Sequence, residues 1–189
     1  MRINTSSALT AAAAAVGMTV GGLLAPASAA PATSTASALC HYTWGSLPKS
    51  NSTMTAGPLT NIRAGRHTCF DRIVIDLRGG ATGYRVEYVS QVVAPGSGNI
   101  VAVRGGAKLQ VTINAPAYDS QGRPTYRPAN PAEAVNVAGY QSLRQVRWLS
   151  SYEGSSTVGV GVRARLPFRV MRLADAGSSR LVIDIAHNW

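Results

Sequence analysis

Two six-residue segments of the chain match each other closely: Arg72–Leu77 reads RIVIDL, and Arg180–Ile185 reads RLVIDI. An aromatic-Arg-Val triplet lies near each copy, at Tyr84–Val86 after the first and at Phe168–Val170 before the second. Alternate positions in both segments carry isoleucine or leucine, which is the period-two pattern of a half-buried strand. A generic strand sequence would explain one copy. Six matched positions favour a pseudo-symmetric pair of strands that contribute to one shared core.

Further alternating runs extend outward from these two segments. They lie at Tyr84–Tyr88, Ala107–Ile113, Val158–Val162 and Phe168–Val170, and they are bounded by Gly, Pro and Ser. Runs of this length and spacing indicate half-buried strands, and no convincing amphipathic helix stands between them. The sequence therefore predicts an all-β fold, most simply a β-sandwich.

Three segments between these runs carry weaker signals. Apolar residues recur at every third position in Tyr140–Tyr152, as in a helix, but Val146 and Trp148 also suit a strand, so this segment stays ambiguous. The pair Gly105-Gly106 predicts a two-residue hairpin turn between its flanking residues. The segment Ala115–Ala134 is rich in Pro, Asn and Tyr and is expected to be a long loop.

Residues 1–29 have the composition of a secretory signal peptide. Arg2 supplies a positive charge, the uncharged apolar stretch Ala8–Leu24 follows, and the small residues of Pro26–Ala30 offer an A-x-A cleavage site. The alternative is a membrane anchor, but a spanning helix needs about 20 strongly apolar residues, and this stretch is shorter and diluted by glycine. We therefore expect a secreted protein without a stable membrane anchor, cleaved after Ala29 or Ala30.

The chain carries a strong excess of positive charge. It has 18 basic and 8 acidic residues, a formal net charge of +10, and loss of Arg2 with the signal peptide lowers this to +9. An exported basic protein meets anionic polymers of the cell envelope more often than nucleic acid. The charge therefore predicts a wall or surface partner and no nucleic-acid partner.

Cys40 and Cys69 are the two cysteines of the chain. In an oxidising compartment they predict one disulfide, which would fasten the segment around Trp44 to the domain. Zinc is the alternative, because His41 and His67 lie close to the two cysteines. Structural zinc sites usually separate paired ligands by two or more residues, whereas Cys40 and His41 are neighbours. We expect no metal and no cofactor.

No catalytic residue can be assigned from the sequence. A serine hydrolase needs a nucleophile elbow such as G-x-S-x-G, and Pro95–Gly98 and Glu153–Ser156 do not match it and are typical of turns. Several carboxylates stand beside arginines on strand patterns, which favours ion pairs over an acid/base pair of the kind that cleaves glycans.

The residues of Arg63–Arg72 spell R-x-G-x-H-x-x-F-D-R, and GYRVEYV follows at Gly83–Val89. With the later strand segments, they resemble the AMIN-like domain of exported actinobacterial proteins, over Leu59–Trp189. The resemblance implies a β-sandwich of two pseudo-symmetric sheets and, by analogy with AMIN domains, association with peptidoglycan. The expected organisation is a signal peptide at residues 1–29, a leader at 30–58 and the AMIN-like β domain at 59–189. The leader is expected to be disordered before Cys40, where the disulfide attaches it to the domain.

These observations predict a secreted, non-enzymatic module that associates with peptidoglycan or another anionic wall polymer. The alternatives are a protein-interaction module of an envelope complex and, less favoured, a secreted wall hydrolase. The guanidinium group of arginine can bind a carboxylate or a phosphate through two parallel hydrogen bonds. The candidate binding residues are Arg63, Arg66, His67, Arg72 and Arg85, which should converge on one exposed concave surface if they form a site.

Overall fold

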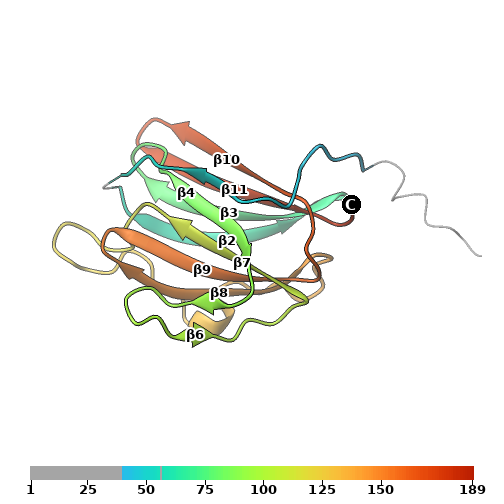
Figure 1. Ribbon diagram of the computed structural model, residues 1–189. Helices are drawn as coiled ribbons and strands as arrows, with labels where there is room; N and C mark the ends of the chain where they lie inside the picture. The colour runs from blue at the N-terminus through green and yellow to red at the C-terminus, as the bar shows by residue number, and fades with distance from the viewer. Residues whose placement is uncertain (1–39, 56) are drawn as a thin grey trace, which may run out of the picture. The chain divides into compact units, whose positions relative to one another are not determined.

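The computed structural model describes residues 40–55 and 57–189, and the signal peptide predicted at residues 1–29 lies outside the described residues. Five strands form the larger antiparallel sheet, in the order β1-β4-β7-β9-β8 (Figure 1). Their bounds are Lys49–Asn51 for β1, Tyr84–Val89 for β4, Ala107–Ile113 for β7, Leu143–Tyr152 for β8 and Ser155–Val162 for β9.

Four strands form the second antiparallel sheet, in the order β10-β11-β3-β2. Their bounds are Leu59–Arg66 for β2, Phe70–Arg78 for β3, Phe168–Asp175 for β10 and Ser178–Ala186 for β11. A small ribbon pairs β5 (Val92–Val93) with β6 (Ile100–Val101), and the 3-10 helix η2 spans Pro131–Glu133. No helical segment in the described part of the chain is long and apolar enough to span a bilayer.

The repeated segments occupy β3 and β11, which lie side by side in the four-stranded sheet and run antiparallel. Val74 pairs with Val182, and the repeat relates the two strands by a local two-fold axis through this pair. Ile75 and Ile183 are both 0% exposed and belong to one core cluster. The prediction of two symmetry-related strands that share a core is therefore confirmed, and the symmetry relates neighbouring strands of one sheet.

The core lies between the inner faces of the two sheets. One cluster of buried apolar side chains joins them, because alternate residues of each strand point to the same face. The cluster includes Ile73, Ile75 and Leu77 of β3, Leu181, Ile183 and Ile185 of β11, Leu109, Val111 and Ile113 of β7, and Val158, Val160 and Val162 of β9. The all-β sandwich predicted from the alternating runs is confirmed.

The structure shows what conformation the segments with weaker sequence patterns adopt. The ambiguous segment Tyr140–Tyr152 is a strand from Leu143 onward, and the leader contributes β1, which pairs with β4. The hairpin predicted at Gly105-Gly106 is wrong. Both edges of β7 are occupied by β4 and β9, so the residues before the two glycines have no place to pair with β7.

Gly161 of β9 allows a close approach of the chain that leads from β6 to β7. A Cβ at this position would lie 1.6 Å from the carbonyl oxygen of Arg104, so the backbone would have to move. We expect Gly161→Ala to lower the free energy of unfolding by about 1–3 kcal/mol, the usual cost of overpacking. Urea unfolding measures this. The control is Gly80→Ala, which has open space around its Cβ, and equal midpoints for the two variants would contradict the prediction.

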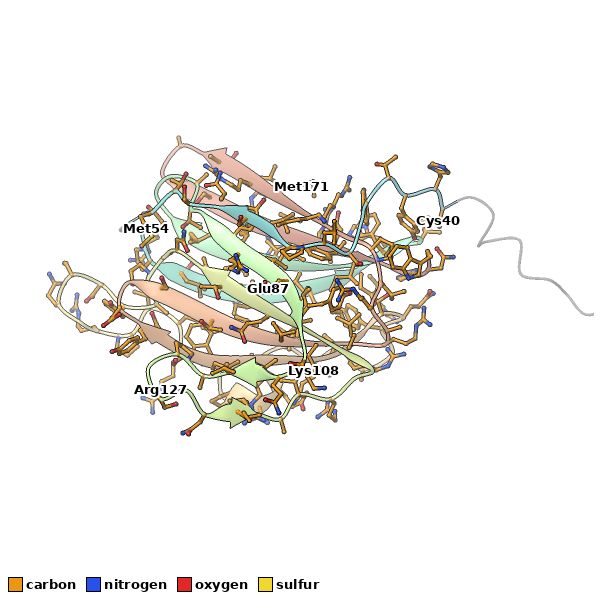
Figure 2. The ribbon with its side chains drawn as sticks, viewed as in Figure 1. Cys40, Met54, Glu87, Lys108, Arg127 and Met171 are labelled. Atoms are coloured by element: carbon orange, nitrogen blue, oxygen red, sulfur yellow. A yellow bond between two sulfur atoms is a disulfide. The ribbon has the colours of Figure 1, made fainter. Side chains whose placement is uncertain are left out.

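The predicted disulfide joins Cys40 to Cys69 with a Cα–Cα distance of 5.4 Å, and Figure 2 labels Cys40 beside the end of the sheet where β3 begins. Next to it, the Tyr42 hydroxyl donates a hydrogen bond to the Cys69 carbonyl. Trp44 packs edge to face on Phe70, with ring centroids 5.8 Å apart. The disulfide therefore holds an aromatic strap, Cys40–Trp44, against the four-stranded sheet.

Candidate functional site

The outer face of the four-stranded sheet carries three of the five predicted site residues. Arg63 of β2 and Arg72 of β3 are on strand positions that face away from the core, and His67 follows the end of β2. With Arg180 of β11 they line a hollow of about 280 Å³, which we call the sheet hollow. Its remaining lining residues are Ala64, Gly65, Val74, Leu173 and Val182.

Carboxylates neutralise the arginines of the sheet hollow. Arg63 binds Asp76 through two hydrogen bonds of 2.9 and 3.1 Å, which raise the pKa of its guanidinium. Arg72 binds Asp184 in the same two-pronged way, at 2.6 and 2.9 Å. Arg180 pairs with an aspartate at the end of β10. An incoming anion would compete with these carboxylates, so the sheet hollow is a poor anion site.

The Asp184 side chain is 0% exposed and organises the aromatic strap. Besides Arg72 it binds Arg169, whose Nε lies 2.8 Å from Oδ2. The Arg169 guanidinium also lies 4.4 Å from the centroid of the Trp44 ring, a cation–π distance. His67 stacks on Phe70 at 4.4 Å between centroids. These contacts give His67, Arg72 and Arg169 a structural role at the sheet's outer face.

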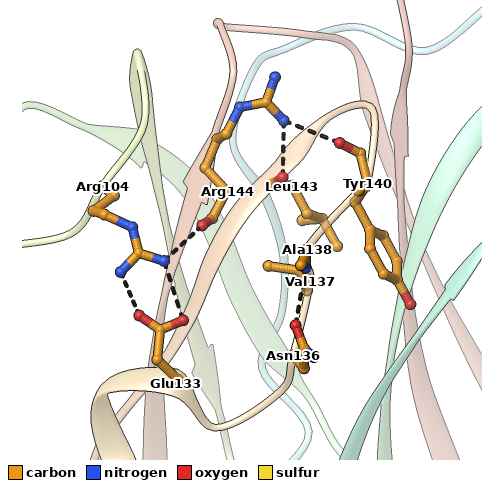
Figure 3. A pocket seen from close by; sticks show the side chains of 9 residues that line it. Arg104, Glu133, Asn136, Val137, Ala138, Tyr140, Leu143 and Arg144 are labelled. Atoms are coloured by element: carbon orange, nitrogen blue, oxygen red, sulfur yellow. Dashed lines mark hydrogen bonds and ion pairs between the residues drawn. The ribbon is translucent and has the colours of Figure 1, made fainter. Parts of the chain in front are cut away.

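Arg66 faces the other way. It pairs with Asp71 in the strand register and is three positions from Arg63, so its side chain lies on the opposite face of β2. Its guanidinium carbon lies 5.8 Å from the Tyr140 ring centroid. Tyr140 lines a second cavity of about 340 Å³, formed by the start of β8 and the chain that precedes it (Figure 3). We call this cavity the basic hollow. Its lining residues are Arg104, Glu133, Asn136, Val137, Ala138, Gly139, Tyr140, Leu143 and Arg144.

The basic hollow has an excess of positive charge. Arg104 pairs with Glu133, and this hydrogen bond lowers the pKa of the Glu133 carboxyl. Arg144 instead donates from one nitrogen, Nη1, to the carbonyl oxygens of Tyr140 and Leu143, at 3.2 and 2.9 Å (Figure 3), and to that of Gln141 at 3.3 Å. Within the described residues, neither Arg144 nor Arg66 forms an ion pair with a carboxylate.

The fifth predicted residue, Arg85, lies on β4 of the five-stranded sheet and binds Glu87, with Nε 2.6 Å from Oε1. The expected convergence of all five residues on one concave surface is therefore wrong, because the chain puts them on two sheets and on opposite faces of β2. Arg104, Tyr140 and Arg144 were not among the residues predicted from the sequence. Gly139, with a φ of 76°, marks the turn that brings Tyr140 beside them.

The chemistry of the basic hollow suits the binding of an anion. Guanidinium groups stay charged at all physiological pH values and present forked donors to carboxylate or phosphate. Tyr140 adds an aromatic surface beside them. Among the described residues, no group of three or more His, Cys, Asp or Glu side chains is arranged to hold a metal ion.

A comparison of the sequence with protein-family models gave a match to the AMIN-like domain over residues 57–187. The matched region includes the whole four-stranded sheet and every strand of the five-stranded sheet except β1. No curated protein and no solved structure matches the sequence.

Proposed function

Because the chain belongs to the AMIN-like domain family, we propose that it is a secreted, non-enzymatic module of the cell envelope that associates with peptidoglycan or another anionic wall polymer. AMIN domains are linked to peptidoglycan, and this link supports the choice of partner. The observation that carries the proposal is a pair of arginines without a carboxylate partner in the described residues: Arg144, which lines the basic hollow, and Arg66, whose guanidinium lies over the ring of the lining residue Tyr140.

The proposed contacts are those between guanidinium groups and the anionic groups of the wall. Peptide stems of peptidoglycan carry carboxylates, and teichoic acids carry phosphates. All three carbonyl bonds of Arg144 are made by Nη1, and no described residue accepts from its Nη2 or Nε, which leaves these donors for a second acceptor. Affinity for one such group is modest, and a polymer raises the retention of the protein by offering many equivalent groups.

The first test is co-sedimentation of the protein, without residues 1–29, with purified sacculi. Raising the salt from 0.1 to 1 M shortens the screening length from about 10 to about 3 Å, so the bound fraction is expected to fall clearly. The double variant Arg66→Gln/Arg144→Gln is expected to bind at least about tenfold more weakly at 0.1 M salt, because hydrogen bonds between charged groups contribute about 1.5–3 kcal/mol each.

The matched control is Arg78→Gln/Arg172→Gln, which removes the same charge from two exposed arginines outside the basic hollow. Thermal unfolding checks the fold of each variant, and Arg66→Gln alone serves if loss of Arg144 destabilises the turn. An equal loss of binding in both double variants would show that the association is nonspecific adhesion of a basic protein. In that case recovery of a defined envelope protein would favour an interaction module instead. Sacculi stripped of teichoic acids separate the two anion sources.

A further inference from the structure

In the described part of the chain, the two sheets end in four edge strands, and three of these offer little to an additional strand. The strand β1 has three residues, and β8 is covered where the Ala134 amide donates to the Val146 carbonyl at 2.8 Å. On β10 the Phe168 amide donates to the Gly45 carbonyl, and the last four residues are all exposed, so an added strand would have little to pack against. Native proteins usually shorten or cover their edge strands in this manner. The fourth edge strand, β2, differs.

Alternate residues of β2 leave their backbone groups unpaired on the open edge. The His67 amide donates to the Phe70 carbonyl, and this bond fixes the phase of the hairpin that joins β2 to β3. Counted back from it, the odd-numbered residues of β2 bond to β3, whereas Ile62 and Ala64 turn their N–H and C=O groups away from β3. No hydrogen bond within the described residues involves these groups. The Ala64 side chain packs against the core and the residue is still partly exposed, as expected at an open edge.

A groove lies beside the first half of this edge. Its volume is about 550 Å³, and residues 60–62 of β2 line one side while residues of the loop 125–134 line the other. We call it the edge groove. The Thr125 hydroxyl donates to the Leu59 carbonyl at 2.6 Å and so fastens the loop to the start of β2. The edge groove is therefore preformed, which reduces the entropy that a ligand has to overcome.

The edge groove has an excess of positive charge. Arg127 lines it and forms no ion pair among the described residues, whereas the lining carboxylate of Glu133 is bound to Arg104. A second copy of the chain is an unsuitable occupant, because both copies carry the same net charge of +10 and repel each other. An extended segment that carries a carboxylate complements the groove.

We propose that β2 takes up an extended, acidic segment of another protein as an additional strand in the edge groove. The added strand bonds to the N–H and C=O groups of Ile62 and Ala64, and one of its carboxylates binds Arg127. In strand addition, main-chain hydrogen bonds supply affinity and alternate side chains supply specificity. The edge groove shares Glu133 with the lining of the basic hollow but contains neither Arg66 nor Arg144. The proposal therefore does not depend on the proposed association with the wall.

Hydrogen exchange followed by NMR tests the edge directly. In the free protein the amides of Ile62 and Ala64 should exchange faster than those of Arg63 and Gly65, which bond to β3. The probe is the peptide Ac-STVTVTE-NH2, whose carboxylate lies near Arg127 if the peptide runs antiparallel to β2, and Ac-STVTVTK-NH2 is the control. The acidic probe should shift the Ile62 and Ala64 signals in a saturable way and slow their exchange. The lysine peptide should bind more weakly.

The decisive variant is Ala64→Pro, which removes one N–H from the open edge. Proline is tolerated in an edge strand where the N–H faces away from the sheet. The affinity for the acidic probe should fall about three- to tenfold, the effect of one lost hydrogen bond. The matched control is Ala174→Pro, which removes an N–H that faces away from β11 on β10 and should bind the probe like the parent protein. Melting temperatures check the fold of both variants.

If Ala64→Pro does not fold, two probes that are N-methylated at alternate residues replace it. Methylation of the amides that face β2 should abolish binding, and methylation of the other set should be tolerated. The proposal is overturned if both methylated probes bind, if Ala64→Pro binds like the parent protein, or if the probe protects β10 instead of β2. Protection of Ile62 and Ala64 that rises with protein concentration, without peptide, would overturn it in favour of a second copy. Arg66→Gln/Arg144→Gln should bind the probe like the parent protein, which separates this test from that of wall association.

Discussion

Asp71→Ala is expected to lower the free energy of unfolding by about 3–5 kcal/mol, because it leaves two buried backbone amides and a buried imidazole nitrogen without the carboxylate that they bind. The Asp71 carboxylate is 0% exposed. Its Oδ2 accepts hydrogen bonds from the amides of Ser142 and Leu143, at 2.6 and 3.1 Å, and its Oδ1 lies 3.1 Å from Nε2 of His187. The carboxylate thus joins the starts of β3 and β8 to the end of β11.

Hydrogen-bond geometry also predicts that asparagine replaces Asp71 at a smaller cost. The Nδ1 atom of His187 faces the Thr68 carbonyl at 3.2 Å, and its Nε2 faces Asp71, so the ring has a polar partner on each side. In Asp71→Asn the amide oxygen still accepts from Ser142 and Leu143, and the amide nitrogen can donate to Nε2 of His187. We expect a loss nearer about 1 kcal/mol, the scale of one ordinary hydrogen bond.

The matched control is Asp76→Asn, five positions later on β3. Asp76 pairs with Arg63, which is 51% exposed, and exposed ion pairs contribute about 0–1 kcal/mol. Urea unfolding of the three variants measures the differences in free energy. The role given to Asp71 is wrong if Asp71→Ala unfolds at the same urea concentration as Asp76→Asn.

Removal of the disulfide by Cys40→Ser/Cys69→Ser is expected to cost about 3–4 kcal/mol. The bond closes a loop with a sequence separation of 29, for which the chain-entropy model gives a value in this range. For a domain of this size the melting temperature should fall by roughly 10 °C. The start of the aromatic strap should also loosen, while Tyr42 keeps its hydrogen bond to the Cys69 carbonyl and Trp44 its contacts with Phe70 and Arg169.

Calorimetry measures the melting temperature of the double variant, and the parent protein treated with a reductant provides the control. The two samples should melt together, since both lack the same bond. Near-ultraviolet circular dichroism reports the packing of Trp44. A double variant that melts within about 2 °C of the oxidised parent would contradict the stabilisation assigned to the disulfide.

The strands with clean alternation could be predicted because they carry apolar residues at every second position, which indicates that one face is buried. In Ala107–Ile113 every second residue is apolar, and these residues form β7. The strand β1 could not be predicted, because Lys49–Asn51 is polar and short and depends on β4 for its hydrogen bonds. Leu143–Tyr152 gave an ambiguous pattern because its register shifts twice against β9, and each shift breaks the period of two.

The candidate site was harder to predict than the fold. Arg63 and Arg66 are three positions apart in one strand, and this odd spacing puts their side chains on opposite faces. The spacing of the two arginines in the sequence therefore predicts that they lie on opposite faces, but it does not indicate which face carries a cavity. The basic hollow depends on Tyr140 and Arg144 at the start of β8 and on Arg104 before β7, and only the tertiary structure brings these two segments together.

The pairing of β3 with β11 has a consequence for the order of events when the protein folds. Arg72 and Asp184, which meet across the two strands, are 112 positions apart, so a long stretch of chain must be closed before this contact adds any stability. Until residues 178–186 have been synthesised, β3 has only β2 as a neighbour and leaves one edge open. Open strand edges invite pairing between different chains. The nascent chain therefore needs protection from aggregation until the second copy of the repeat arrives to cover the first.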